Sequence, residues 1–149
     1  MKTQTLQGEF DHVYSDDPAI DREADDWKAQ YNAAIETSDP GKLPLTPGAK
    51  PVLWRLRHLS RGERSLVLDL LHGAGANQAA DAAVRLALVA CSGATDKVGK
   101  AITLKRDGRV GDFVGLRMEA LDVIASAYAE QLVAELWGRV INSFNPQKG

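Results

Sequence analysis

The side chains that could ligate a soft metal ion are few and far apart in the sequence. Zinc sites use cysteine and histidine at short spacings such as CxxC or HxxxH. No pair among the candidates has such a spacing, and a single cysteine excludes an internal disulfide and any multi-cysteine zinc site. We therefore expect no metal site and no cofactor. The candidates are His12, His58, His72 and Cys91.

Catalytic motifs do not fit the sequence either. The segment Gly73-Ala74-Gly75-Ala76-Asn77-Gln78 contains the GxG of a nucleotide-binding turn, but glutamine stands where a third small residue belongs. The run before it opens with a capping box, Ser60 to Glu63, which favours a helix where that motif needs a strand. The sequence contains no GxSxG elbow and no P-loop. We expect a protein that is not an enzyme.

Basic side chains in the middle of the chain could contact phosphates. Aromatic residues do not interleave with them, and no predicted helix has a basic face, so nucleic-acid binding is the less favoured interpretation. The alternatives are a solvated face or ion pairs with the acidic N-terminal region. The nine residues are Arg55, Arg57, Arg61, Arg64, Lys97, Lys100, Lys105, Arg106 and Arg109.

Charge is distributed unevenly along the 149 residues, although the formal net charge is only -2. Residues 1–48 carry ten acidic and four basic side chains, a net charge of -6, whereas residues 49–109 carry eleven basic and five acidic ones, a net charge of +6. The two regions could neutralise each other within one molecule or between neighbouring copies. Tryptophans could anchor such a contact by burying area. The predicted partner-binding residues are Trp27, Trp54, Arg55, Arg57, Arg106, Arg109 and Trp137.

Composition predicts an ordinary folded protein. The chain is 44% hydrophobic and 26% charged, which excludes a fully disordered or fibrous class. The first twelve residues contain no apolar core of a signal peptide. The most apolar stretch, residues 79–94, is too short to span a bilayer and contains Asp81 and Arg85, so no membrane association is expected.

Apolar periodicity predicts an α+β fold, mostly helical, with about four helices, a small antiparallel sheet or hairpin, and an extended N-terminal arm. An acidic cluster over residues 16–26 is interpreted as the capped start of the first helix, with Asp17 as its N-cap. Asp107-Gly108 suits a two-residue hairpin turn. The predicted elements are an arm or edge strand over 1–16, helices over 18–36, 61–72, 77–91 and 116–144, a strand over 52–57 and a hairpin over 101–114.

A proline-rich connector marks the predicted domain boundary. Residues 38–51 contain four prolines and two glycines, which favour an extended chain. The boundary separates residues 1–50, an acidic arm with a helix and this connector, from residues 51–149, a helical core domain with a hairpin. Leu70 and Leu132 lie in periodic apolar stripes and are predicted core residues.

Two segments give the sequence a family resemblance. The first is ProValLeuTrpArgLeuArgHisLeuSerArgGlyGlu at 51–63, followed by an alanine-rich helix and a charged hairpin. The second is the closing run from Glu135 to Phe144, GluLeuTrpGlyArgValIleAsnSerPhe. Over roughly residues 50–144 the chain resembles small morphogenesis proteins of tailed bacteriophages, most of all the tail assembly chaperone type. The resemblance does not extend to the connector or the acidic N-terminal region.

The resemblance implies a non-enzymatic protein that acts through protein–protein contacts during phage assembly. Its partners would be other phage structural or assembly proteins, with a homo-oligomer or ring as the expected state. It would be found in the host cytoplasm during assembly, or in the virion. Two alternatives stay open: a virion neck or capsid accessory protein, whose arm runs along a neighbour, and a small nucleic-acid-binding regulator supported by the basic middle.

Overall fold

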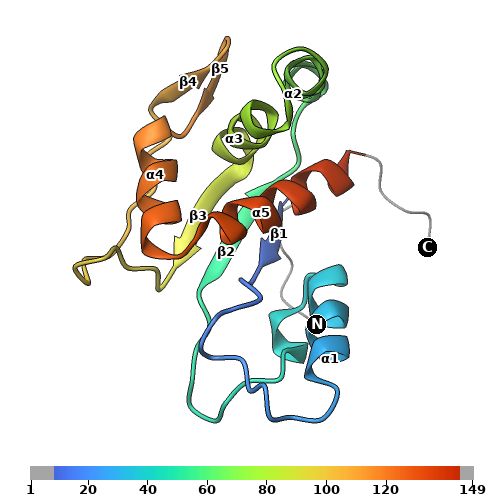
Figure 1. Cartoon of the computed structure of the whole chain (residues 1–149), viewed down its shortest axis with the longest axis vertical. Coiled ribbons are helices and arrows are strands. Elements are labelled where there is room, and N and C mark those ends of the chain that lie inside the picture. Colours follow the sequence, from blue (N-terminus) through green and yellow to red (C-terminus); the bar gives the residue numbers. More distant parts are fainter. Residues whose placement is uncertain (1–8, 145–149) are drawn as a thin grey trace.

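The computed structural model describes residues 9–144, which form an α+β fold that is 46% helical. The described part contains five α-helices, a three-stranded antiparallel sheet and a two-stranded hairpin (Figure 1). In chain order the elements are β1 (Glu9–His12), α1 (Trp27–Glu36), the 3-10 turn Pro40–Lys42, β2 (Leu53–Arg57), α2 (Arg61–Gly73), α3 (Ala76–Ala87), β3 (Leu88–Ser92), β4 (Gly108–Val110), β5 (Phe113–Gly115), α4 (Met118–Ala127) and α5 (Glu130–Ser143).

The three-stranded sheet has β2 at its centre, in the order β1-β2-β3. Along β2, Trp54 and Leu56 are buried whereas Leu53, Arg55 and Arg57 are half-buried, which confirms the alternation predicted for this strand. Phe10 of β1 lies opposite Leu56, and Cys91 of β3 lies opposite Trp54. One face of the sheet therefore supplies a continuous apolar wall for the helices.

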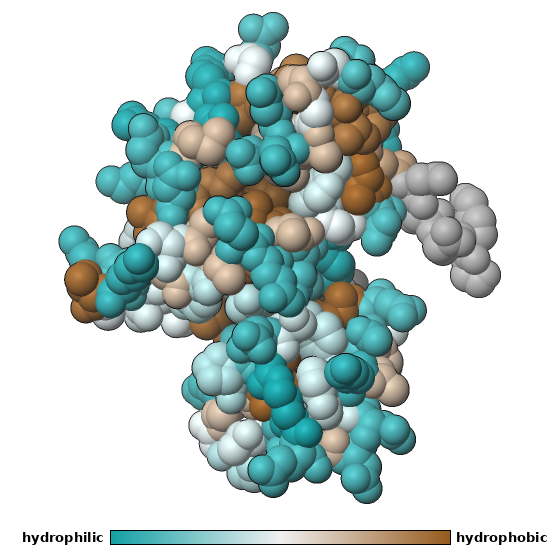
Figure 2. All heavy atoms as spheres, in the orientation of Figure 1, coloured by the Kyte–Doolittle hydropathy of each residue, from teal (hydrophilic) through white to brown (hydrophobic). Residues whose placement is uncertain are grey.

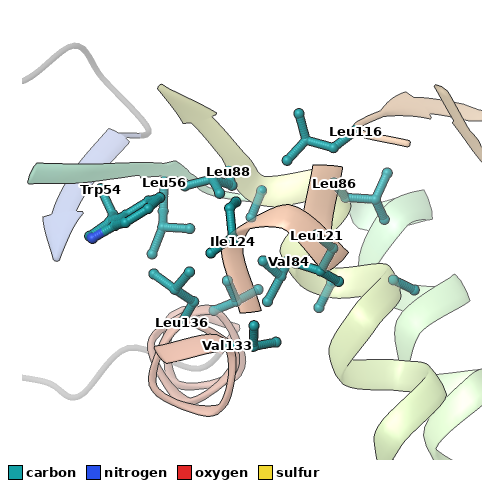
Figure 3. Close-up of a cluster of buried hydrophobic side chains, with 14 of the residues drawn as sticks. Trp54, Leu56, Val84, Leu86, Leu88, Leu116, Leu121, Ile124, Val133 and Leu136 are labelled. Carbon is teal, nitrogen blue, oxygen red and sulfur yellow. The ribbon is translucent and has the colours of Figure 1, made fainter. Parts of the chain in front are cut away.

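The main hydrophobic core fills the space between this wall and the helices α3, α4 and α5 (Figure 3). Leu88, Ile124 and Leu136 come from three different elements and are all fully buried. A second, smaller cluster joins α1 to the chain on either side of it. Its buried members are Val13, Ile20, Tyr31, Ala34 and Leu43. The acidic region thus has its own apolar anchor beside the main core.

The N-terminal segment contributes to the core sheet, because β1 pairs with β2 over four residues. The edge-strand alternative for this region therefore holds for residues 9–12, while the rest of the predicted arm, residues 1–8, lies outside the described residues. On its outer side, the Asp11 N–H donates to Ser38 Oγ at 2.8 Å and Arg139 Nη1 donates to the Asp11 carbonyl at 3.0 Å. The domain boundary near residue 50 remains a prediction.

The helix expected over residues 18–36 begins later, at Trp27. Asp17 is not its N-cap: the Asp17 carboxylate accepts hydrogen bonds from the Ala19 and Val52 amides at 2.8 and 2.9 Å. Residues 17–26 instead form turns, and Asp26 has φ 57° in the left-handed region. The Asp17 carboxylate, which was predicted to cap a helix, thus links this turn to Val52, the residue that follows the connector.

Two other predicted helices are divided. The helix expected over 77–91 is α3 as far as Ala87, and Leu88–Ser92 is strand β3, because pairing with β2 overrides the local helical composition. The helix expected over 116–144 breaks at Tyr128 and Ala129. Tyr128 packs edge-on against Trp54, with ring centroids 5.4 Å apart, and its hydroxyl accepts from the Thr95 amide at 3.0 Å. The break lets the buried residues of both helices, such as Leu121 of α4 and Leu136 of α5, face one core.

The hairpin turn lies at Gly111-Asp112, not at Asp107-Gly108 as predicted. Gly111 has φ 59°, and its position close to Leu66 of α2 leaves little room for a side chain. With this turn, Arg106 lies before β4 and Arg109 pairs with Val114. The capping box is confirmed: the Glu63 amide donates to Ser60 Oγ at 3.2 Å, and the Ser60 amide donates to the Glu63 carboxylate at 2.8 Å.

Candidate functional site

Three of the predicted partner-binding residues are committed to the fold of the chain itself. Trp54 has an exposed fraction of 0%, which is a correction to its role as a surface anchor, because its ring fills the main core. Arg55 Nε donates to Asp11 Oδ1 at 3.0 Å across the β1–β2 pair. Arg57 Nη1 donates to Glu63 Oε1 at 3.0 Å, which joins β2 to the first turn of α2. Part of the basic surplus is thus neutralised within the molecule.

Arg106 ties the hairpin region to the carboxyl end of α3. Its guanidinium donates to the carbonyls of Leu86 and Leu88, both at 2.8 Å, and to the Val114 carbonyl at 3.2 Å. A cation at this end of a helix also interacts favourably with the helix dipole. Burial lowers the pKa of Arg106 from its ordinary value, and the nearby positive charge of Arg57 adds to this. Arg106 is therefore a structural clamp.

The other predicted contact residues keep exposed surface. Trp27 is half-buried at the start of α1, where the cations of Arg22 and Lys28 lie 5.1 and 5.9 Å from its ring centroid. Trp137 packs partly against the main core, and Arg109 is exposed. The seven residues thus do not form one surface. Their role in binding a partner remains a prediction for Trp27, Arg109 and Trp137.

A polar cluster that the sequence analysis did not identify joins the N-terminal segment to α5. Glu135 is its centre: Oε1 is 2.7 Å from His12 Nε2 and accepts from the Ser15 amide at 3.1 Å, while Oε2 accepts from the Ser15 hydroxyl. The Tyr31 hydroxyl donates to the Val13 carbonyl at 2.6 Å and lies 3.5 Å from Glu135 Oε1. Three separate segments of the chain, residues 12–15, α1 and α5, therefore meet at one carboxylate.

The cluster contains the side chains of a catalytic triad but not its geometry. In a triad the histidine accepts the proton of the serine and the acid orients the histidine. Here the serine and the histidine both bind the acid. The remaining ring nitrogen, His12 Nδ1, lies 3.3 Å from Arg139 Nη1. The arrangement links α5 to the N-terminal segment.

The contacts of His12 fit a neutral imidazole with its proton on Nε2, which donates to Glu135 while Nδ1 accepts from Arg139. Burial lowers the pKa of His12, although its hydrogen bond to Glu135 acts in the opposite direction. Burial alone would raise the pKa of Glu135, but hydrogen bonds from His12 and Ser15 outweigh it and the net shift is downward. At neutral pH the cluster therefore holds a neutral histidine beside a carboxylate.

These shifts predict that the protein loses stability in mild acid. A histidine with a lowered pKa in the folded state favours folding above its unfolded pKa, near 6.5, and this contribution is lost as the pH falls through the folded value. We expect a lower free energy of unfolding at pH 5.5 than at pH 7.5, measured by urea denaturation. The lowered pKa of Glu135 acts in the same direction below about pH 4.5.

The control for this experiment is His72→Gln, which replaces an exposed histidine of α2 and should leave the pH dependence unchanged. His12→Gln should reduce the difference between pH 7.5 and 5.5. An equal pH dependence in His12→Gln and the unchanged protein would contradict the assignment.

Exposed apolar residues gather around α4 and the loop before β4. Val98 is 86% exposed at the tip of the loop over residues 93–101, which projects from the body of the molecule (Figures 1 and 2). Val123 of α4 is 43% exposed, and the two valines line one shallow hollow of about 400 Å³. We name this hollow the Val98–Val123 surface; its other lining residues are Asp96, Lys97, Asp122 and Ser126.

Comparison with known proteins finds no match: no family, no curated protein and no solved structure is similar to the chain. Residues 9–144 contain no group of three or more histidine, cysteine, aspartate or glutamate side chains placed to share a metal ion. Over the same residues, every helix is too short or too polar to span a lipid bilayer.

Proposed function

We propose that this chain is a non-enzymatic assembly protein that works through protein–protein contacts, of the kind that tailed phages use in particle morphogenesis. The observation that carries the proposal is the Val98–Val123 surface. A valine at 86% exposure on a projecting loop is unfavourable in a monomer and becomes favourable when a partner covers it. Two further exposed apolar residues, Val114 of β5 and Met118 in the first turn of α4, are 47% and 40% exposed.

The charges around this surface support contact with a protein. Asp96, Lys97 and Asp122 line the same hollow as the two valines, so the apolar patch has a polar rim of both signs. Protein interfaces combine an apolar centre with such a rim, which sets register and excludes wrong partners. The partners under this proposal are other structural or assembly proteins of the particle, and further copies of the chain.

The proposal predicts that Val98→Asp weakens association while the chain stays folded. The protein is co-expressed with the products of its neighbouring genes, and complexes are measured by sedimentation. We expect a complex with the unchanged chain and a loss of at least ten-fold in affinity with Val98→Asp, because a charge would be buried at the contact.

Leu68→Asp is the matched control, since Leu68 is also an exposed apolar residue but lies on α2. It should leave the complex intact. If the unchanged chain stays monomeric and binds none of these proteins, or if both variants behave alike, the proposed function is wrong. A complex formed with DNA instead of protein would favour the regulator alternative.

A further inference from the structure

The Val98–Val123 surface has two walls of opposite charge. One wall is the loop over residues 93–101, which contains two lysines and one aspartate, a net charge of +1. The other wall is α4, which contains two acidic residues and no basic one, a net charge of -2. Lys97 and Asp122 line the hollow itself, one from each wall. A partner that fits this surface must therefore present both signs of charge.

The loop holds Val98 in a fixed position, although the side chain of Val98 is 86% exposed. The Asp96 carboxylate accepts hydrogen bonds from the Val98 and Lys100 amides, both at 2.9 Å. The Asp96 amide donates to the Lys100 carbonyl at 2.8 Å, and Thr95 pairs with Ala101 at the base of the loop. An apolar residue that is already held in place loses little conformational entropy when a partner covers it.

The negative charge of the α4 wall is reinforced from α3 and α5. Burial, and then the charges of Glu130 on α5 and Asp122 on α4, raises the pKa of Asp81 on α3. Arg85 acts on Asp81 in the opposite direction, but more weakly. Within residues 9–144, neither Lys97 nor Asp122 belongs to an ion pair. Both groups are therefore available to pair with charges of another molecule.

A projecting apolar residue, an adjacent hollow and opposite charges on two walls make this surface complementary to itself. When two copies meet about a two-fold axis, every contact between two different residues occurs twice, once in each direction. Val98 of each copy can then enter the hollow of the other beside Val123, since about 400 Å³ is more space than a valine side chain fills. In the same arrangement Lys97 of each copy faces Asp122 of the other.

We propose that the Val98–Val123 surface binds a second copy of the chain as a two-fold symmetric dimer, in which Val98 enters the opposite hollow and Lys97 pairs with Asp122. This inference rests on the proposed function, because it names the partner of the same surface.

The first measurement is sedimentation equilibrium of the unchanged chain alone, at protein concentrations up to about 1 mM, which populate even a weak dimer. We expect a concentration-dependent change from monomer to dimer and no larger species, because a two-fold contact closes on itself. Val98→Asp should weaken the dimer by about ten-fold or more, since each copy would then bury a carboxylate in the hollow of the other.

Charge reversal tests the reciprocal pairing. Lys97→Asp puts a carboxylate opposite Asp122 at both contacts, and Asp122→Lys puts an ammonium group opposite Lys97. Each variant alone should therefore dimerise about ten-fold or more weakly than the unchanged chain. In an equal mixture of the two variants, both contacts of a mixed dimer again join opposite charges. The mixture should recover dimers within about three-fold of the original affinity.

Lys42→Asp is the matched control, because Lys42 is exposed on the 3-10 turn and lies outside this surface. It changes the charge as much as Lys97→Asp does and should leave the dimer unchanged. A chain that is monomeric at every concentration, a dimer that Val98→Asp does not weaken, or a mixture that fails to recover would each overturn this inference. If a monomeric chain still binds a neighbouring gene product and Val98→Asp abolishes that binding, the inference fails alone and the proposed function stands.

Discussion

Replacing Leu132 with alanine is expected to lower the free energy of unfolding by about 4 kcal/mol. Leu132 is fully buried on α5, within the main hydrophobic core. Removing its branched end leaves a cavity that the surrounding side chains close only in part. The measurement is urea denaturation at pH 7.5 and 25 °C, with the unfolding slope checked for constancy.

Leu70→Ala supplies the comparison within the same experiment. The sequence assigns both leucines to the core, but Leu70 is only half-buried at the margin of the main cluster. Leu70→Ala should therefore lower the free energy of unfolding by only about 1.5 kcal/mol, because less apolar surface returns to water than in Leu132→Ala. Equal costs for the two variants, or a Leu132→Ala variant within 1 kcal/mol of the unchanged chain, would show that the core is packed differently.

Replacing Glu135 with alanine is expected to lower the free energy of unfolding by about 3 kcal/mol. The variant leaves the Ser15 amide, the Ser15 hydroxyl and the Nε2–H of His12 without their acceptor at a site that is mostly closed to water. Unpaired donors at such a site cost their full desolvation free energy. The same variant should keep the acid sensitivity that comes from His12, because burial lowers the pKa of His12 whereas its contacts with Glu135 raise it. It should lose the further contribution of Glu135 below about pH 4.5.

Glu130→Ala is the matched control, because Glu130 lies on the same helix but is exposed. It should cost about 0.5 kcal/mol, from its position in the first turn of α5. Glu135→Gln keeps one acceptor oxygen and should fall between the two. If Glu135→Ala and Glu130→Ala are equally stable, the carboxylate does not hold the junction together.

The elements that the sequence predicts well are those whose signals are local. The strand over 52–57 alternates apolar and polar residues, and Ser60 and Glu63 form a motif within one helical turn. The prediction of secondary structure fails where pairing with a distant segment determines the conformation. Leu88–Ser92 has the composition of a buried helix, but its backbone pairs with Leu53–Leu56, more than thirty residues away. Periodicity within a window contains no information on such pairing.

The dependence on distant contacts also explains why the sequence analysis did not identify the polar cluster around Glu135. His12 and Glu135 are 123 residues apart in the chain, and no spacing rule connects them. The hairpin turn is a different case, since Gly111-Asp112 is itself a turn signal and competed with Asp107-Gly108. The closeness of Gly111 to α2 favours the observed turn, and only the assembled fold contains that contact.

The outer side of β1 has a consequence for solubility at high concentration. An uncovered edge strand can recruit another chain through its backbone, and repeated recruitment produces cross-β fibrils. At the middle of β1, however, the Asp11 amide is occupied by Ser38 and the Asp11 carbonyl by Arg139. Polymerisation through that edge would first have to break both bonds, so many copies can be crowded together without growing a common sheet from β1.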